Sequence, residues 1–409
     1  LSAVEIYDKP RFAYRGAMLD VARHFYTVDE VKTFIDMLAL HNINRFHWHL
    51  TDDQGWRIEI KKYPKLMSVA SERKETVVGR WYSGIYDGKP YGGYYTQDEL
   101  RDVIDYAAKR HITIIPEVDL PGHMQAALTA YPELGCTGGP YEVRTIWGVS
   151  QDVLCVGNDF TLQFVKDVLS EVADIFPSEY IHIGGDECPK VRWEKCPKCQ
   201  ERIKSLGLKS DAKHTKEQRL QSYMIQEAAK YLKEKGKRII GWTEILEGGL
   251  VPDATLMSWI GESGGIEAAH QHHDVIMTPN TYLYFDYYQS KKVEDEPLAI
   301  GGYLPIEKTY NYEPMPKELT KEEQQYIKGV QANLWTEYTH VYDVNVDMKA
   351  DTVNHVLNVQ LSTMADDPIY YTLDGQDPTE KSLKYTKPFT IDQSVVLKTM
   401  AVHPDRTSK

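Results

Sequence analysis

Residues 164–184, FVKDVLSEVADIFPSEYIHIG, join a helical pattern to a strand pattern. The first part places apolar residues on one helix face, at Phe164, Val165, Val168, Leu169, Val172 and Ile175. The last part, residues 180–184, is a short β-rich run. The same alternation recurs along the chain and is typical of a parallel α/β fold. We predict eight strands, at residues 12–20, 43–50, 112–118, 180–184, 238–242, 255–259, 274–278 and 329–335.

The segments between these strands carry helix start and stop signals. Residues 27–30 (TVDE) and 96–99 (TQDE) both have the capping-box pattern. A further helix is expected from about residue 217 to 234, ended by Gly236. Eight strands with intervening helices predict an α/β chain that folds as a (β/α)₈ TIM barrel.

The pattern changes after residue 337. Residues 355–361, 369–373 and 395–402 alternate apolar and polar side chains, and an Asp374-Gly375 turn follows the second segment. We therefore predict a barrel over residues 1–339 and a small antiparallel β-sandwich module over residues 340–409. An eighth covering helix is expected after residue 337 but no such pattern follows. Either the barrel is open on one side or residues between about 339 and 341 are absent from this numbering, and we favour the second because an uncovered strand would expose apolar surface.

The composition narrows the class of ligand. The 409 residues include 47 Lys and Arg against 60 Asp and Glu, a net charge of −13 that argues against nucleic-acid and anionic-membrane partners. No run reaches the roughly 18 apolar residues of a membrane helix. The chain has 28 Tyr against 9 Phe, and such rings with a polar tip often line sites for sugars. Since Leu1 starts no signal-peptide pattern, we expect a mature or trimmed chain.

Chemistry in a barrel belongs at the carboxyl ends of the strands. Ten candidate functional residues stand at or after those ends: Asp52, His123, Asp186, Glu187, Trp242, Trp259, Tyr284, Asp286, Trp335 and Glu337. Arg15, within the first strand, is an eleventh candidate. Carboxylates, imidazoles and indoles are thus predicted to meet on one rim.

The adjacent Asp186 and Glu187, which follow two glycines, are the sharpest feature of this set. Two carboxylates in one pocket have divergent pKa values, so one can act as a general acid while the other stays charged. The alternative is an N-cap pair that opens the next helix.

Tryptophans stand at or just after four strand ends, at positions 48, 242, 259 and 335. Their rings are suited to stacking on a pyranose, although filling the space between barrel and helices is the alternative for any single one. If Arg15 points inward, it binds a ligand hydroxyl or a buried carboxylate, and a structural ion pair is the alternative.

The spacing of His47 and His49 would suit a metal site, since alternate residues of a strand face the same way. Barrel metallohydrolases need further histidines at strands five and six, where this chain has tryptophans. We therefore predict no metal and no cofactor. His123 is interpreted as an imidazole that orients the acid and bridges to Asp52, with a purely structural histidine as the alternative.

Five cysteines are too few for a disulfide framework. Cys188, Cys196 and Cys199 lie close in sequence, but a structural zinc needs a fourth ligand and no fourth cysteine is near. Free thiols or one disulfide are favoured there. Cys136 and Cys155 flank a glycine-rich loop, and a disulfide between them stays open.

Several linked motifs resemble the family 20 glycoside hydrolases, the exo-acting β-N-acetylhexosaminidases. They are residues 14–25 (YRGAMLDVARHF), 46–57 (FHWHLTDDQGWR), 121–123 (PGH) and 182–187 (HIGGDE). The resemblance covers about residues 10–339, and residues from about 341 resemble the β-sandwich module of bacterial chitobiase-type enzymes. It implies a retaining hydrolase of N-acetylhexosamine-terminated glycans that lacks a protein nucleophile, because the 2-acetamido oxygen of the substrate attacks instead.

The resemblance also implies roles for the reacting groups. Glu187 would be the general acid and base, Asp186 would orient the acetamido group and stabilise the charge on its nitrogen, and Tyr284 would bind its oxygen. Asp52 and His123 would form the relay behind Glu187.

The remaining implied roles concern the sugar. Trp242, Trp259 and Trp335 would enclose it, while Arg15 and Glu337 would hold the O3, O4 and O6 side. Asp286 matches members that bind an uncharged C6 hydroxyl, and it argues against 6-sulfated substrates.

The chain also departs from the family. We expect the given sequence to be cut at its start, after the usual N-terminal α/β domain, to miss the segment of the last barrel helix, and to stop within its C-terminal module. Alternatives to the main function are a lacto-N-biosidase-like or sulfated-hexosamine glycosidase, or a carbohydrate-binding protein without catalysis. The resemblance further suggests export to the periplasm or cell surface and leaves a homodimer open.

Overall fold

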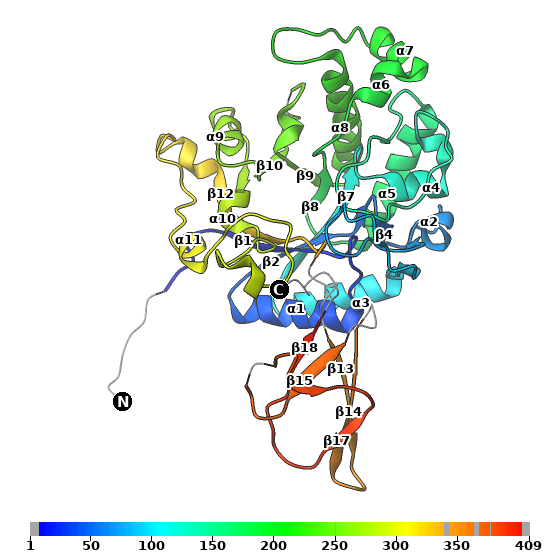
Figure 1. Ribbon diagram of the computed structural model, residues 1–409. Coiled ribbons are helices and arrows are strands. Elements are labelled where there is room, and N and C mark those ends of the chain that lie inside the picture. Colours follow the sequence, from blue (N-terminus) through cyan, green and yellow to red (C-terminus); the bar gives the residue numbers. More distant parts are fainter. Residues whose placement is uncertain (1–7, 250, 339–343, 364–367, 377, 403–409) are drawn as a thin grey trace.

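The computed structural model describes residues 8–249, 251–338, 344–363, 368–376 and 378–402. Eight parallel strands close into a barrel in the order β1-β2-β7-β8-β9-β10-β11-β12 (Figure 1). All eight predicted strands are confirmed, with ends that differ by a few residues. They are β1 (Tyr14–Asp20), β2 (Arg45–His49), β7 (Thr113–Leu120), β8 (Tyr180–Gly184), β9 (Arg238–Trp242), β10 (Thr255–Ser258), β11 (Val275–Met277) and β12 (Ile327–Leu334).

Four longer helices cover the first half of the barrel: α1 (Val28–Leu40), α3 (Gln97–Ala108), α5 (Asp159–Ile175) and α8 (Lys216–Glu234). The capping boxes at Thr27 and Thr96 are formed as predicted, and Thr215 caps α8 in the same way. The second half carries shorter elements: η2 (Thr243–Leu246), α9 (Ser263–His270), α10 (Asn280–Leu283), η3 (Val293–Asp295), α11 (Ile306–Tyr310) and η4 (Glu323–Tyr326).

The loops that follow β2, β7 and β8 contain short helices and strands. They are β3 (Thr51–Asp52), β4 (Gly55–Trp56), α2 (Lys65–Ser68), β5 (Glu72–Arg73), β6 (Tyr91–Gly92), α4 (Gln125–Ala130), η1 (Pro132–Leu134), α6 (Val191–Lys195) and α7 (Pro197–Ser205). Because these loops leave the carboxyl ends of the strands, they build the rim on which the candidate residues stand.

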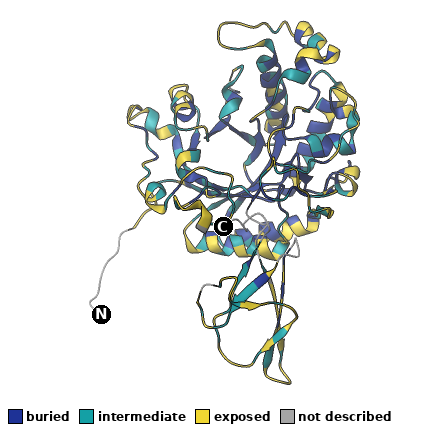
Figure 2. Ribbon diagram, viewed as in Figure 1, coloured by how far each residue is buried: buried dark blue, intermediate teal, exposed yellow. Residues whose placement is uncertain are grey.

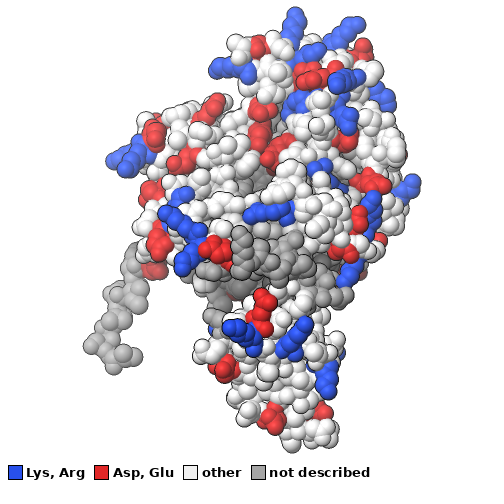
Figure 3. Space-filling view, in the orientation of Figure 1, with Lys and Arg blue, Asp and Glu red and all other residues white. Residues whose placement is uncertain are grey.

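The core has two layers. The larger layer lies between the strands and the helices, and the smaller fills the barrel with Tyr14, Ile115, Ile240, Trp242, Met257 and Ile276. The strands are accordingly buried, while the outer faces of the helices are exposed (Figure 2). Acidic and basic side chains of the described residues are interspersed on the face drawn in Figure 3.

The C-terminal part forms two three-stranded antiparallel sheets, as predicted. Their strands are β13 (Asn345–Asp351), β14 (Val356–Ser362), β15 (Ile369–Thr372), β16 (Leu383–Lys384), β17 (Phe389–Ile391) and β18 (Lys398–Ala401). Val359, Leu361 and Ile369 form the core between the sheets. Along the described chain, β13 is the next element after β12, and the predicted gap near residues 339–341 falls outside the described residues.

Among the described residues, every helix is too short or too polar to cross a lipid bilayer.

Candidate active site

A pocket opens at the carboxyl ends of the barrel strands and has a volume of about 190 Å³. It contains every predicted site residue except Arg15. Its lining consists of Arg23, Asp52, Asp119, His123, Asp186, Glu187, Trp242, Trp259, Tyr284, Asp286, Tyr287, Ile300, Trp335 and Glu337. The volume lies below the roughly 300–1,000 Å³ of pockets for drug-sized ligands. The pocket therefore suits one small ring rather than a chain.

Asp186 and Glu187 are presented by a tight turn at the end of β8. Gly184 has φ +66°, and a Cβ on it would lie 1.6 Å from Oδ1 of Asp119. The same Asp119 oxygen accepts a hydrogen bond from the amide of Gly185 at 3.2 Å. The N-cap alternative for Asp186 and Glu187 is wrong, since the next helix, α6, begins only at Val191.

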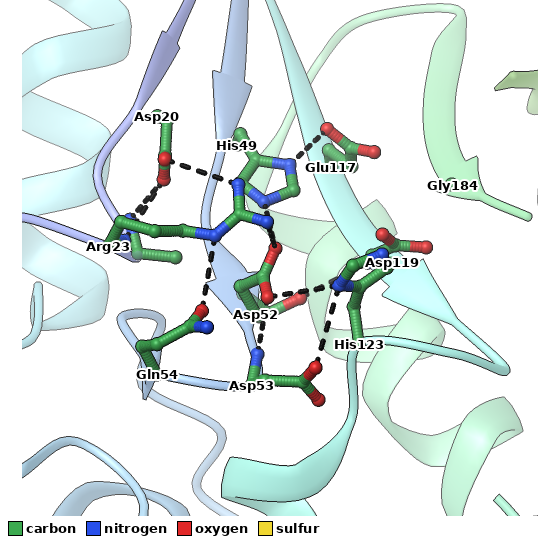
Figure 4. A network of polar contacts seen from close by, with 12 residues as sticks. Asp20, Arg23, His49, Asp52, Asp53, Gln54, Glu117, Asp119, His123 and Gly184 are labelled. Carbon is green, nitrogen blue, oxygen red and sulfur yellow. Dashed lines mark hydrogen bonds and ion pairs between the residues drawn. The ribbon is translucent and has the colours of Figure 1, made fainter. Parts of the chain in front are cut away.

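His123 belongs to a buried polar network, in which it contacts Asp52 and Asp53 (Figure 4). Its Nδ1 lies 3.1 Å from Oδ1 of Asp52, and its Nε2 lies 3.6 Å from Oε2 of Glu187 and 3.8 Å from Oδ2 of Asp186. Asp52 is held in turn by Arg23, at 2.9 Å, and by His49, at 3.0 Å. The contact between His123 and Asp52 is the one that the sequence predicted.

The network separates the pKa values of the two adjacent carboxyls. Burial favours a neutral His123, but the Asp52 carboxylate outweighs it and raises the pKa of His123 well above its usual range. The neighbouring His123 in turn lowers the pKa of Glu187. Burial, together with the charges of Glu117 and Glu187, raises the pKa of Asp186. The predicted divergence is present, with Asp186 as the group of raised pKa in the free protein.

Aromatic rings form the walls of the pocket. Trp259 stacks on Tyr284 with ring centroids 6.1 Å apart, and Trp242 meets Trp335 at 6.0 Å. The indole of Trp242 donates a hydrogen bond to Glu117 at 2.9 Å, which fixes its ring plane. Trp48 faces the opposite way and packs in the core between barrel and helices, so the filler alternative holds for that tryptophan.

The expectation that Arg15 binds the sugar is wrong. Arg15 lies at the amino end of the barrel, where its guanidinium donates to the carbonyls of Phe12 and Asn42, each at 2.8 Å. Arg23, just beyond the carboxyl end of β1, lines the pocket instead. The sequence could have indicated this, because successive residues of a strand face opposite sides. Tyr14 points into the barrel, so its neighbour Arg15 points outward.

Comparison with known proteins bears directly on this pocket. The model of the glycosyl hydrolase family 20 catalytic domain matches residues 12–349, and the chitobiase/beta-hexosaminidase C-terminal domain matches residues 348–409. This chain belongs to glycosyl hydrolase family 20.

Two curated relatives illustrate the family 20 likeness. A beta-hexosaminidase of Porphyromonas gingivalis is 54% identical over 338 residues, which cover 82% of this chain and 41% of that protein. A beta-hexosaminidase of Vibrio furnissii is 41% identical over 344 residues, which cover 83% of this chain and 55% of that protein. The family 20 chain thus spans about half the length of these two relatives.

A solved structure has the same fold. It is the family 20 exo beta-N-acetylglucosaminidase of Vibrio harveyi in complex with N-acetylglucosamine. The TM-score is 0.70 at 39% identity, and the match covers 81% of this chain and 51% of that one.

Asp286 and Glu337 also line the pocket of this family 20 barrel. Asp286 is only 7% exposed, yet among the described residues neither of its carboxylate oxygens has a hydrogen-bond partner. Burial raises the pKa of both carboxyls, and the charge of Glu337 raises the pKa of Asp286 further. Buried polar atoms without partners are costly, so these oxygens are suited to meet the hydroxyls of a ligand.

Glu244, which follows β9 and was not among the predicted site residues, contacts the wall of the family 20 pocket without lining it. It accepts a hydrogen bond from the indole of Trp259 at 2.9 Å. Burial, and then the charge of Asp186, raises its pKa to about 8. Its position two residues past Trp242, at the end of a barrel strand, was the available signal.

The two histidines considered for a metal both contact one carboxylate. Nε2 of His47 lies 2.8 Å and Nδ1 of His49 lies 2.5 Å from Oε2 of Glu117. Since Glu117 also accepts from Trp242, this buried cluster supports the floor of the pocket.

Proposed function

We propose that this protein is a retaining exo-β-N-acetylhexosaminidase that releases terminal β-linked GlcNAc or GalNAc from glycans. The observation that carries the proposal is the pair Asp186 and Glu187, backed by His123, in a small aromatic pocket. Membership of glycosyl hydrolase family 20 supports it. The family uses substrate-assisted catalysis, in which the acetamido group replaces a protein nucleophile.

In the first step, the acetamido oxygen attacks the anomeric carbon and the glycosidic bond breaks. Glu187 donates its proton to the leaving oxygen. The resulting oxazolinium carries positive charge at its nitrogen, and the adjacent Asp186 carboxylate stabilises that charge. Tyr284 donates its hydroxyl hydrogen to the acetamido oxygen and orients it for the attack.

In the second step, Glu187 accepts a proton from water, and this water opens the oxazolinium with overall retention. Glu187 must therefore carry a proton when substrate is bound, although its pKa is lowered in the free protein. Its side chain is 42% exposed. A sugar bound in the pocket displaces the solvent around the Glu187 side chain, and this desolvation raises the pKa of its carboxyl.

Arg23, Glu337 and Asp286 bind the O3, O4 and O6 side in this proposal, with Arg23 in the role first expected of Arg15. The unpartnered oxygens of Asp286 favour a neutral C6 hydroxyl, whereas a sulfate would need a cation at this position. The small volume of the pocket favours one residue over the disaccharide of a lacto-N-biosidase. Neither alternative glycosidase is therefore preferred.

Turnover tests the proposal directly. We expect release of single GlcNAc units from the non-reducing end of chitobiose and chitotriose, and cleavage of 4-nitrophenyl β-GlcNAc. Binding of these sugars without turnover would favour the silent carbohydrate-binding alternative. Release of a disaccharide or of a 6-sulfated sugar in preference to GlcNAc would favour the other glycosidases.

A thiazoline analogue of the oxazolinium should inhibit strongly. Because it mimics an intermediate held between Asp186 and Tyr284, we expect it to bind at least about 100-fold more tightly than GlcNAc. Competition against 4-nitrophenyl β-GlcNAc measures both constants. Equal affinities would contradict a mechanism that depends on the acetamido group.

The pH profile should report the relay. Asp52→Asn removes the charge that holds His123 protonated, so the positive charge beside Glu187 is lost. The pKa of Glu187 then rises, and the alkaline limb of kcat should move upward by about one pH unit. The profile of kcat against pH measures this shift, and retained thiazoline binding shows that the pocket is folded. An unmoved or downward-shifted limb would contradict the relay.

Location and assembly are part of the proposal. We infer export to the periplasm or cell surface from the family resemblance alone, and the same resemblance leaves a homodimer open. Cell fractionation tests the first, and light scattering on the purified protein tests the second.

A further inference from the structure

Four cysteines that are far apart in sequence meet at one place outside the pocket. Sγ of Cys199 lies 3.8 Å from Sγ of Cys136 and 3.6 Å from Sγ of Cys155, while Cys155 and Cys196 are 3.7 Å apart. All four sulfurs lie within 4.8 Å of one another. Cys136 and Cys155 thus supply the two further ligands that the pair Cys196 and Cys199 needs, and Cys188 is not part of the cluster.

The sulfur separations fit a single tetrahedral ion. With metal–sulfur bonds of about 2.3 Å, the edges of a ZnS₄ tetrahedron measure about 3.8 Å. A disulfide needs about 2.05 Å. All five cysteines are free thiols in this structure, so the disulfide left open between Cys136 and Cys155 is not formed.

Two chain segments are packed closely to bring these sulfurs together. A Cβ on Gly157 would lie 2.3 Å from the carbonyl oxygen of Lys198 and from the amide nitrogen of Cys199, so only glycine allows this approach. Cys136 and Cys155 are aligned by an antiparallel bridge between Gly135 and Leu154.

Two of the four cysteines lie at the amino end of a helix. Cys196 is the N-cap residue of α7, and Cys199 lies in its first turn, where the positive end of the helix dipole stabilises negative charge. Cys155, Cys196 and Cys199 are buried, and Cys136 is half-buried. Four buried sulfurs at these distances are the ligand set that soft divalent cations prefer.

We propose that Cys136, Cys155, Cys196 and Cys199 bind one structural Zn²⁺. With four protein ligands the site is closed, which is typical of structural rather than catalytic zinc. The thiols release their protons on binding, and Lys195 and Lys198 lie next to the ligands in sequence to offset the negative charge of the centre.

The site would clamp together the two loops that carry the acid and its relay. Cys136 and Cys155 belong to the loop after β7, which bears His123, and the other two ligands belong to the loop after β8, which bears Glu187. The indole of Trp193 already joins these loops by donating to the carbonyl of Leu154 at 2.9 Å. Zinc would add a further link between them.

Metal analysis of the full chain tests the proposal. Protein expressed with zinc and then dialysed against metal-free buffer should retain about one zinc per chain. Inductively coupled plasma mass spectrometry measures this metal content. Cys199→Ser should retain less than about a tenth of that and melt at least about 5 °C lower. Cys136→Ser, at the half-buried ligand, is the milder variant should Cys199→Ser fail to fold.

Cys188→Ala is the matched control, since it removes a buried thiol outside the cluster. It should keep its zinc. Titration of this variant with a mercurial reagent should release one zinc as four thiols react, measured with a coloured zinc indicator. Any of three results would overturn the proposal: no bound metal, iron in place of zinc, or a disulfide among the four cysteines by intact mass.

Discussion

Replacing Glu187 with glutamine should nearly abolish hydrolysis of chitobiose. The variant keeps the size and polarity of the side chain but cannot donate the proton that the leaving sugar needs. General acid catalysis contributes about 10²- to 10⁴-fold, so we expect kcat on chitobiose to fall by about 10³-fold or more. The leaving group of 4-nitrophenyl β-GlcNAc needs little protonation, so with this substrate the rate of the first step should fall much less.

The comparison of the two substrates separates the acid role from a general defect. Glu194→Gln is a matched control, because Glu194 is an exposed carboxylate on α6 in the same loop. We expect it to behave like the unmodified protein on both substrates. Equal losses for chitobiose and the aryl glycoside in Glu187→Gln would count against Glu187 as the leaving-group acid.

Asp186→Asn should have the second largest effect. Asp186 is buried, and its Oδ1 has no hydrogen-bond partner among the described residues, so the carboxylate is poised for a group of the substrate. The amide has no charge to stabilise the oxazolinium. Loss of one such preorganised interaction costs about 10²- to 10³-fold in kcat.

Two measurements distinguish this role from simple substrate binding. The change should appear mainly in kcat with little change in KM, because the charge develops only in the transition state. The thiazoline should lose affinity in parallel with kcat. Asp98→Asn, on the exposed side of α3, is the control. A kcat within tenfold of the unmodified protein would remove Asp186 from the proposed mechanism.

Loss of substrate turnover and loss of zinc are independent outcomes. The cysteine cluster belongs to the loops after β7 and β8, and none of its members lines the pocket. A chain without zinc that still hydrolyses chitobiose would refute the metal site alone. A zinc-bound chain without turnover would refute the proposed function alone.

Periodicity allowed much of the fold to be predicted. The strands at 180–184 and 238–242 were placed to the residue, because parallel barrel strands are buried on both faces and stand out as short apolar runs. The carboxyl ends of those strands then placed Asp186 and Trp242 at the pocket. The link between His123 and Asp52 was also predicted, since both follow neighbouring strands.

The failures concern side-chain direction and pairing. Arg15 and Arg23 stand eight residues apart, and only the path of the chain beyond β1 brings Arg23 back over the pocket, where it contacts Asp20 and Asp52. Trp48 and Trp242 both sit at strand ends, but the first packs outward against helices and the second inward. Linear spacing does not encode these choices.

The sequence by itself determined the barrel and the β-sandwich module, because both follow from local hydrophobic periodicity. It also determined the carboxylate pair, because Asp186 and Glu187 are adjacent in the chain. Only the tertiary structure decided which arginine reaches the pocket, how His123 separates the pKa values of Asp186 and Glu187, and that four cysteines meet. Electrostatic coupling and metal geometry depend on distances of a few ångströms between segments that are remote in the chain. Such distances exist only once the barrel has closed and its loops have packed.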